Sequence, residues 1–118
     1  MTDFRLGFGP MSYEIAVALS FYAYTNKKPI MIIASRNQVD HDSGYVMTTQ
    51  QLKHTLDMNK SPNLLLCRDH CGPYFLDSER ELSERDAIEA TKKTIAKDIE
   101  VGFDLIHIDT SRCANGYN

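Results

Sequence analysis

The segment Asn63-Leu64-Leu65-Leu66-Cys67-Arg68-Asp69-His70-Cys71-Gly72-Pro73 decides the fold of this chain. Its first half is an apolar run as long as one strand, and its second half holds polar and reactive side chains before a Gly-Pro break. Continuous apolar runs are typical of strands that are buried on both faces of a parallel sheet. In α/β proteins such strands carry functional residues at their carboxyl ends. The segment therefore predicts a central parallel strand that ends in a candidate site.

Two other segments repeat this design. Residues 29–38 run from an apolar stretch into Ser35, Arg36, Asn37 and Gln38, and residues 103–111 run into His107, Asp109 and Ser111. Residues 4–8 are a shorter apolar segment before Gly9-Pro10, and they predict a first strand. The sequence thus predicts four strands, three of which end in polar side chains.

The segments between these strands have helical signals. The expected apolar stripes are Ile15, Leu19 and Tyr22 in the first helix, Leu52 and Leu56 in the second, and Ile88, Thr91, Ile95 and Ile99 in the third. Thr48 and Gln51 have capping-box spacing, and Gly102 suits a helix end. Residues 39–47 are expected to form a polar loop with Asp40, His41 and Asp42 in solvent.

Strands that alternate with helices over short connections call for a parallel sheet. The order β-α-β-α-β-α-β predicts an α/β fold of parallel (β/α) units, namely four strands and three helices, the first half of a TIM-barrel-like fold. A complete barrel of this type needs about 200 residues or more, and this chain has 118. We therefore expect residues 1–118 to be one partial barrel domain, either the N-terminal half of a longer barrel or a short relative of it.

Bulk composition excludes several classes of protein. The net charge of −3 gives no electrostatic reason to expect nucleic acid or an anionic membrane as a partner. No apolar stretch approaches the ~20 residues of a membrane span. Three cysteines are an odd number, which argues against a disulfide framework and predicts a reducing, cytoplasmic location. The sequence also lacks the Gly-x4-Gly-Lys-Ser/Thr phosphate loop.

Asp69 and His70 are the first candidate site residues. As neighbours in a regular strand they would point to opposite faces, so they reach one site only if the strand ends or bulges there. An imidazole can bind a divalent metal, and a carboxylate beside it can move a proton. The alternative is that Asp69 pairs with Arg68 or caps a loop amide, while His70 lines a polar rim.

His107 and Asp109 are two residues apart and share one face of the fourth strand. With Leu105 on the same face, they would point into the barrel, while Ile106 and Ile108 pack on helices. Titratable groups on the inner face of a buried strand are costly unless they are paired or solvated at a site. The alternative is a structural hydrogen bond between neighbouring strands.

The remaining polar side chains at the strand ends suit a sugar phosphate. Asn37 and Gln38 offer donors and acceptors for hydroxyl groups, and Arg36 and Arg68 could hold a phosphate. Surface salt bridges are the alternative for both arginines.

Several motifs in this chain resemble those of the non-catalytic subunit of class II D-tagatose-1,6-bisphosphate aldolase. They are Asn37-Gln38-Val39, Gly44-Tyr45, Met47-Thr48, Asp69-His70-x-Gly72-Pro73 and Gly102-Phe103-x-x-Ile106-His107-x-Asp109-x-Ser111. That family is a TIM barrel related to the zinc-dependent class II ketose-bisphosphate aldolases, and the resemblance covers roughly residues 7–113. Members have also been labelled tagatose 6-phosphate kinases, a name that the missing phosphate loop does not support here.

The resemblance implies a role for each matched residue. By the resemblance, Asp69 matches the acid/base aspartate, His70 matches a zinc-binding histidine, and His107 and Asp109 match the fourth-strand motif beside the site, while Asn37 and Gln38 lie near the substrate. We take Asp69 and Asp109 as the candidate catalytic residues. The candidate substrate contacts are Asn37, Gln38, Arg68, His107 and Ser111. The chain departs from the family pattern at Ile33, Arg36, Cys67, Arg68 and Tyr74, where family members carry other residue types.

Three functions follow from these residues and this resemblance. The first is a subunit that acts on a phosphorylated sugar in carbohydrate metabolism and supports aldol cleavage, a carbon-carbon lyase reaction, with Zn²⁺ as the implied cofactor. It would work as a homo-oligomer or with a catalytic aldolase subunit. The second is a half-barrel binding or assembly module without catalysis. The third is a sugar-phosphate epimerase or isomerase that uses Asp69 and Asp109 as its acid/base pair.

Overall fold

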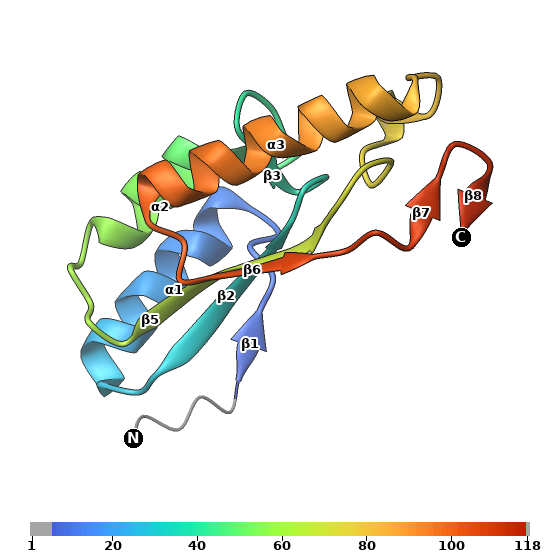
Figure 1. Cartoon of the computed structure of the whole chain (residues 1–118). Coiled ribbons are helices and arrows are strands. Elements are labelled where there is room, and N and C mark those ends of the chain that lie inside the picture. The colour runs from blue at the N-terminus through green and yellow to red at the C-terminus, as the bar shows by residue number, and fades with distance from the viewer. Residues whose placement is uncertain (1–5, 118) are drawn as a thin grey trace.

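The computed structural model describes residues 6–117 of the chain. Four parallel strands form one sheet in the order β1-β2-β5-β6 (Figure 1), with bounds Gly7–Phe8, Ile30–Ser35, Leu64–Cys71 and Leu105–Ile108. Helices α1 (Tyr13–Asn26), α2 (Thr49–Asp57) and α3 (Glu84–Val101) connect them and lie side by side along the sheet. The predicted α/β class, with four parallel strands and three helices of a TIM-barrel-like unit, is confirmed. Of the first predicted strand, residues 4 and 5 lie outside the described residues.

Shorter elements occupy the connections. Within residues 39–47, expected to be loop alone, β3 (Val39–Asp40) pairs in parallel with β4 (Met47–Thr48). A 3-10 turn, η1 (Asp77–Glu79), precedes α3. After β6, the strands β7 (Arg112–Cys113) and β8 (Gly116–Tyr117) form an antiparallel hairpin that the sequence did not predict. Figure 1 shows this hairpin standing beyond the carboxyl end of the sheet.

The core lies between the sheet and the helices. Alternate residues of β2 are buried because they face the helices, and the buried apolar residues are Ala16, Ala23, Ile30, Ile32, Ala34, Val39, Met47, Leu52, Leu56 and Leu66. The capping box of α2 is confirmed, since Thr48 N–H donates to Gln51 Oε1 at 2.8 Å and Gln51 N–H donates to Thr48 Oγ1 at 3.2 Å. Within residues 6–117, no helix is long and apolar enough to cross a membrane.

Helix α1 packs through small residues and not through the apolar stripe that the sequence predicted. Ala16, Ser20 and Ala23 are buried, whereas Ile15 is 42% exposed and Tyr22 is 39% exposed. Small side chains let α1 approach α2 closely, and Ser20 Oγ donates to the carbonyl of Leu56 at 2.9 Å. The expected stripe is therefore wrong at its two large outer positions.

Helix α3 turns a partly polar face to the sheet. Its buried residues are Ala87, Thr91, Thr94 and Asp98. Of the expected stripe, Thr91 is buried as predicted, whereas Ile95 is half-buried and Ile88 and Ile99 are exposed. The cause is the presence of Arg36, directly after β2, and of Arg68 in β5 beneath this helix, because buried guanidinium groups require polar partners. Gly102 ends the helix with a left-handed backbone (φ +86°), as expected.

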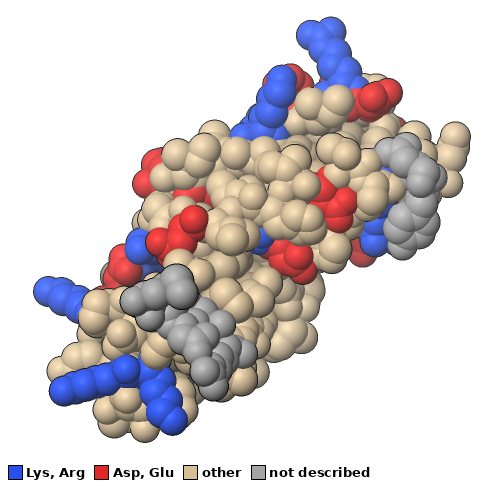
Figure 2. All heavy atoms as spheres, turned by 60° about the horizontal axis from the view of Figure 1, so that its bottom comes forward, with Lys and Arg blue, Asp and Glu red and all other residues tan. Residues whose placement is uncertain are grey.

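The other face of the sheet, which would line a barrel, is open. Leu105 is 50% exposed on this face, as its alternation with Ile106 predicted. β1 and β6 are the outer strands of the sheet. Figure 2 shows basic side chains mainly near the two ends of one view of the molecule, with acidic side chains scattered between them, so neither sign dominates that surface.

Candidate functional site

Strand β5 is bulged near its carboxyl end. Its register with β6 shifts between Arg68 and Cys71, and His70 has a left-handed backbone with φ +47°. Such a backbone is rare for a residue other than glycine and often marks a functional position. The bulge brings Asp69 and His70 to one site, the condition that the sequence required of this strand, and His70 Nε2 lies 3.6 Å from Asp69 Oδ2.

Gly72 allows the ends of β5 and β6 to meet. A Cβ atom at Gly72 would overlap the carbonyl oxygen of Asp109. The two strand ends are joined by a hydrogen bond from the Asp109 N–H to the carbonyl of Cys71 at 3.2 Å. Only glycine leaves room for this approach, which places Asp109 beside His70.

Four side chains from β5 and from the end of β6 form the strand-end cluster, defined as Asp69, His70, His107 and Asp109. Asp109 Oδ2 lies 2.6 Å from His70 Nδ1, and Asp69 Oδ1 lies 3.4 Å from His107 Nδ1. The centroids of the two imidazole rings are 5.7 Å apart. Both histidine side chains are 52% exposed, so a ligand can reach them.

Asp109 is held in its charged form. Hydrogen bonds from Ser111 and from His70 keep the pKa of this carboxyl well below its usual range, and the Ser111 backbone N–H lies 2.9 Å from Oδ1. A charged carboxylate at His70 Nδ1 favours the tautomer with the proton on that nitrogen. His70 Nε2 is then an acceptor that points away from Asp109, which is the arrangement of a metal ligand or a base.

Two predicted substrate contacts lie at the end of β2. Asn37 Nδ2 donates to the carbonyl of Phe75 at 3.0 Å, and Asn37 shares a cavity wall with His70. Gln38 Oε1 accepts from the Ser35 N–H at 3.0 Å, and its Nε2 lies against the sulfur of Met11. Asn37 is therefore placed beside the strand-end cluster, whereas Gln38 braces the turn after β2.

Arg68 lies away from the site. Its guanidinium is fully buried on the helix side of β5 and donates twice to the Asp98 carboxylate, at 2.8 Å each. Nη1 also donates to the carbonyl of Val39. Burial and these bonds leave no path to a ligand at the strand ends, so the prediction of Arg68 as a substrate contact is wrong.

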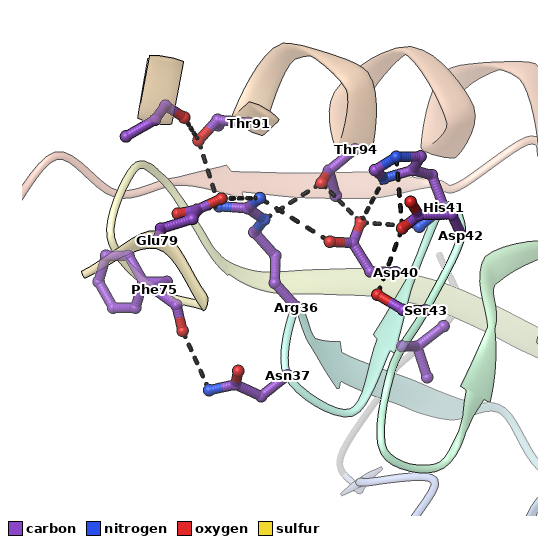
Figure 3. A network of polar contacts seen from close by, with 12 residues as sticks. Arg36, Asn37, Asp40, His41, Asp42, Ser43, Phe75, Glu79, Thr91 and Thr94 are labelled. Carbon is purple, nitrogen blue, oxygen red and sulfur yellow. Dashed lines mark hydrogen bonds and ion pairs between the residues drawn. The ribbon is translucent and has the colours of Figure 1, made fainter. Parts of the chain in front are cut away.

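Arg36 is buried in the same way (Figure 3). It donates to Glu79 Oε1 and to the carbonyl of Gly72, at 2.6 Å each, so the prediction that Arg36 could hold a phosphate at the strand ends is also wrong. Asp40 accepts from Thr94 Oγ1 at 2.6 Å and lies 3.8 Å from Arg36, so its expected exposure to solvent is wrong too. We call this set, Arg36, Asp40, Arg68, Glu79, Thr91, Thr94 and Asp98, the buried network.

The strand-end cluster has the donors of a cation site. Asp69, His70 and His107 each offer one ligand atom, and these atoms lie within 4.8 Å of one another. One carboxylate and two imidazoles are ligands that Zn²⁺ takes in proteins. The same groups can transfer protons without an ion, because a carboxylate and an imidazole form an acid/base pair.

Phe75 and Arg112 are site residues that the sequence interpretation missed. The Phe75 ring is stacked on His70 with centroids 5.2 Å apart, and the Arg112 Cζ lies 4.4 Å from the Phe75 centroid. Arg112 directly follows the predicted Ser111, and that position could have identified it. No sequence pattern connects Phe75 to the site, because its ring arrives from the loop after β5.

Buried thiols lie close to the site without the properties of nucleophiles. Burial raises the pKa of Cys71 to about 11, and burial also raises the pKa of Cys67. Both are therefore protonated near neutral pH and act as small apolar side chains.

Two comparisons relate this chain to known proteins. Residues 11–117 match the family described as D-tagatose-1,6-bisphosphate aldolase subunit GatZ/KbaZ-like. A crystal structure described as a probable tagatose 6 phosphate kinase from Sinorhizobium meliloti 1021 is similar, with a TM-score of 0.76 and 25% sequence identity. That similarity covers 94% of this chain and 30% of the other chain, so this chain spans less than a third of the protein that it resembles.

Proposed function

Because the chain belongs to the GatZ/KbaZ-like family of D-tagatose-1,6-bisphosphate aldolase subunits, we propose that it carries a sugar-phosphate site of such a subunit. The family resemblance expected from the sequence motifs is confirmed, and with it a relation to sugar metabolism. The observation that supports the proposal best is the β5 bulge, which brings Asp69 and His70 together with His107 and Asp109. The chain would support aldol cleavage of a phosphorylated ketose.

Each residue of the strand-end cluster has a role in this proposal. Aldol cleavage needs a base for a substrate hydroxyl and an acid for the carbanion that forms, and in this proposal Asp69 acts as both. Asp109 orients His70 through the 2.6 Å contact at Nδ1. His107, Asn37 and Ser111 would bind hydroxyl groups of the sugar.

A divalent metal fits the same side chains. Asp69, His70 and His107 would hold it, and the charged Asp109 behind His70 is the outer partner that metal-bound histidines usually have. When bound, Zn²⁺ would polarise the substrate carbonyl and stabilise the negative charge that develops on its oxygen. The chain's own part is to keep His70 Nε2 pointing to the ion.

Zinc uptake by the purified 118-residue chain tests the cluster. We expect His70→Ala to weaken Zn²⁺ binding by about tenfold or more, because it removes one of three ligands. His54→Ala is the matched control, since His54 is an exposed histidine of α2 outside the cluster. Equal zinc affinity of His70→Ala and His54→Ala, measured by competition with a chromophoric chelator, would exclude the metal role of His70.

We also propose that further (β/α) units complete this half-barrel, either from a longer chain, a second copy or a catalytic aldolase subunit. Within residues 6–117, no further strand pairs with the outer edges of β1 and β6, and such edges invite pairing. Leu105 and Ile108 at the β6 edge are 50% and 55% exposed. This feature also favours the alternative of an assembly module without catalysis.

Light scattering on the 118-residue chain separates these partners. A cooperative dimer would support closure by a second copy. A monomer that forms a complex only with a catalytic aldolase subunit would support that subunit as the partner. If the complex forms and Asp69→Ala leaves its turnover unchanged, the assembly-module alternative is favoured over the catalytic one.

A further inference from the structure

Helix α1 has an uncharged, largely apolar outer face. The buried side of the helix, with Ala16 and Ala23, faces the core. At about 3.6 residues per turn, Ala18, Phe21 and Thr25 lie on the opposite side, and all three are exposed. A helix that covers a sheet normally turns charged or polar residues to solvent, whereas a helix that is apolar all round is normally buried. The outer face of α1, defined as Ala18, Phe21 and Thr25, therefore has the character of a covered surface.

Large apolar and aromatic side chains border this face. Phe21 is 59% exposed, Tyr24 is 57% exposed and Ile15 is 42% exposed. Among the described residues, those that line a groove along the face are all uncharged, namely Phe8, Ile15, Ala18, Leu19, Phe21, Tyr22, Thr25 and Asn26. The cores of protein interfaces are enriched in aromatic residues and depleted of charged ones. Helices that lie on membranes carry Lys and Arg along a polar face, and α1 contains neither, so its composition favours a protein partner.

The two ends of α1 carry opposite charges. Glu14 lies in the first turn and Lys28 follows the last turn, and both are exposed. Phe21 is seven residues from each of them, so it lies at the midpoint of a stretch about 20 Å long. Two antiparallel copies of α1 with Phe21 at the centre would bring Glu14 of each copy to Lys28 of the other, whereas parallel copies would bring like charges together. Such a self-complementary pattern is what a two-fold interface requires.

We propose that the outer face of α1 is a two-fold interface between two copies of this chain. The two helices lie antiparallel, with both Phe21 rings at the axis and a Glu14–Lys28 pair at each end. Ala18 and Thr25 are small, so the helices approach closely on either side of the rings. The strand-end cluster lies on β5 and at the end of β6, so this interface does not depend on the proposed function.

Sedimentation equilibrium of the purified 118-residue chain measures the dimer Kd. We expect Phe21→Ala to raise this Kd by about tenfold or more, because it removes both rings from the centre of the interface. Leu105→Ala is the matched control, since Leu105 is 50% exposed on the open face of the sheet, where a closed half-barrel would form. Its dimer Kd should equal that of the unmodified chain. Zinc affinity should be the same in Phe21→Ala as in the unmodified chain, so the interface and the proposed site can fail separately.

Three results would overturn the α1 interface. The first is a chain that stays monomeric at every concentration measured. The second is a dimer that Phe21→Ala leaves unchanged. The third is a dimer that is weakened by Leu105→Ala alone, which would assign the association to closure of the half-barrel. Circular dichroism of each variant confirms that the comparison is between folded proteins.

Charge reversal tests the antiparallel arrangement. Glu14→Lys and Lys28→Glu should each raise the dimer Kd by about threefold to tenfold, because each places like charges at both ends of the interface. The double variant with both substitutions should recover the original Kd, since opposite charges again meet across the axis. Both native charges also suit the dipole of α1, but a dipole effect is least favourable in the double variant and would restore nothing. A double variant that dimerises as weakly as the single variants would overturn the antiparallel pairing.

Discussion

The strand-end cluster and the buried network show two uses of charge near the carboxyl ends of the strands of one sheet. Asp69 and Arg68 are neighbours in the sequence, yet Asp69 meets His107 on the open face and Arg68 meets Asp98 under α3. The network is fully buried, and its arginines have several partners each. The cluster is half exposed, and its longer contacts of 3.4 and 3.6 Å leave ligand atoms accessible.

This difference indicates which charges serve stability and which serve chemistry. A buried charge persists only if its partners satisfy it, so the network fixes α3 on the sheet. A side chain that must bind a ligand stays partly exposed to solvent, and its backbone can be strained, as at His70. Stability and ligand binding should therefore respond to different substitutions.

Loss of one partner in the buried network is expected to have the largest effect. Asp98→Ala leaves the Arg68 guanidinium buried without its carboxylate, which should cost about 3–5 kcal/mol of the free energy of unfolding. Urea denaturation followed by circular dichroism measures this change. Glu89→Ala is the control, because it breaks only the exposed Glu89–Lys92 pair of the same helix and should cost at most about 0.5 kcal/mol. Similar losses for the two variants would contradict a structural role for the network.

Gly72→Ala is expected to have an intermediate effect on the free energy of unfolding. Gly72→Ala forces the ends of β5 and β6 apart, since its Cβ would overlap the Asp109 carbonyl, and should cost about 1–3 kcal/mol. The Asp109 amide, bonded to Cys71, should then exchange its hydrogen faster. In Gly102→Ala, which changes a left-handed glycine with open space around it, this amide should keep its protection. An Asp109 amide equally protected in both variants would refute the close approach.

Two substitutions at His70 should differ least in stability. They also show most clearly that stability and zinc binding respond to different changes. Both His70→Gly and His70→Ala remove the imidazole, but only glycine adopts φ +47° without strain. We expect His70→Gly to be more stable than His70→Ala by about 1 kcal/mol, and both to bind zinc more weakly than the unmodified chain. Chemical denaturation of the two variants under one condition measures the difference. Equal stability would show that the bulge holds no strain at this residue.

The sequence predicted the fold from the periodicity of its strands and helices. Apolar runs that end in polar side chains located β2, β5 and β6, and capping signals located the start of α2 and the end of α3. The faces of the helices were harder to predict. The network residues Thr91, Thr94 and Asp98 of α3 lie toward the sheet because β2 and β5 place arginines there, and helical periodicity alone carries no information about such partners.

The sequence predicted the central residues of the site, but it did not predict correctly which of the surrounding residues belong to it. Alternation places Asp69 and Arg68 on opposite faces, and applying the same rule to both residues would have removed Arg68 from the site. The contribution of Phe75 depends on a loop whose path no local signal fixes. Arg112 was predictable only as a neighbour of Ser111, since its contact with Phe75 exists only in three dimensions.

The bulge at His70 has a consequence for protein engineering. In a regular strand, a designer who wants a carboxylate and an imidazole on one side must place them two residues apart and accept whatever lies between them. Here four consecutive residues, Asp69 to Gly72, place a carboxylate and an imidazole on the same side of the sheet. The last of them, Gly72, leaves room for the neighbouring strand. The four positions are thus a compact module that could be transplanted onto the rim of another parallel sheet, provided that the adjacent strand supplies a carboxylate in the place of Asp109.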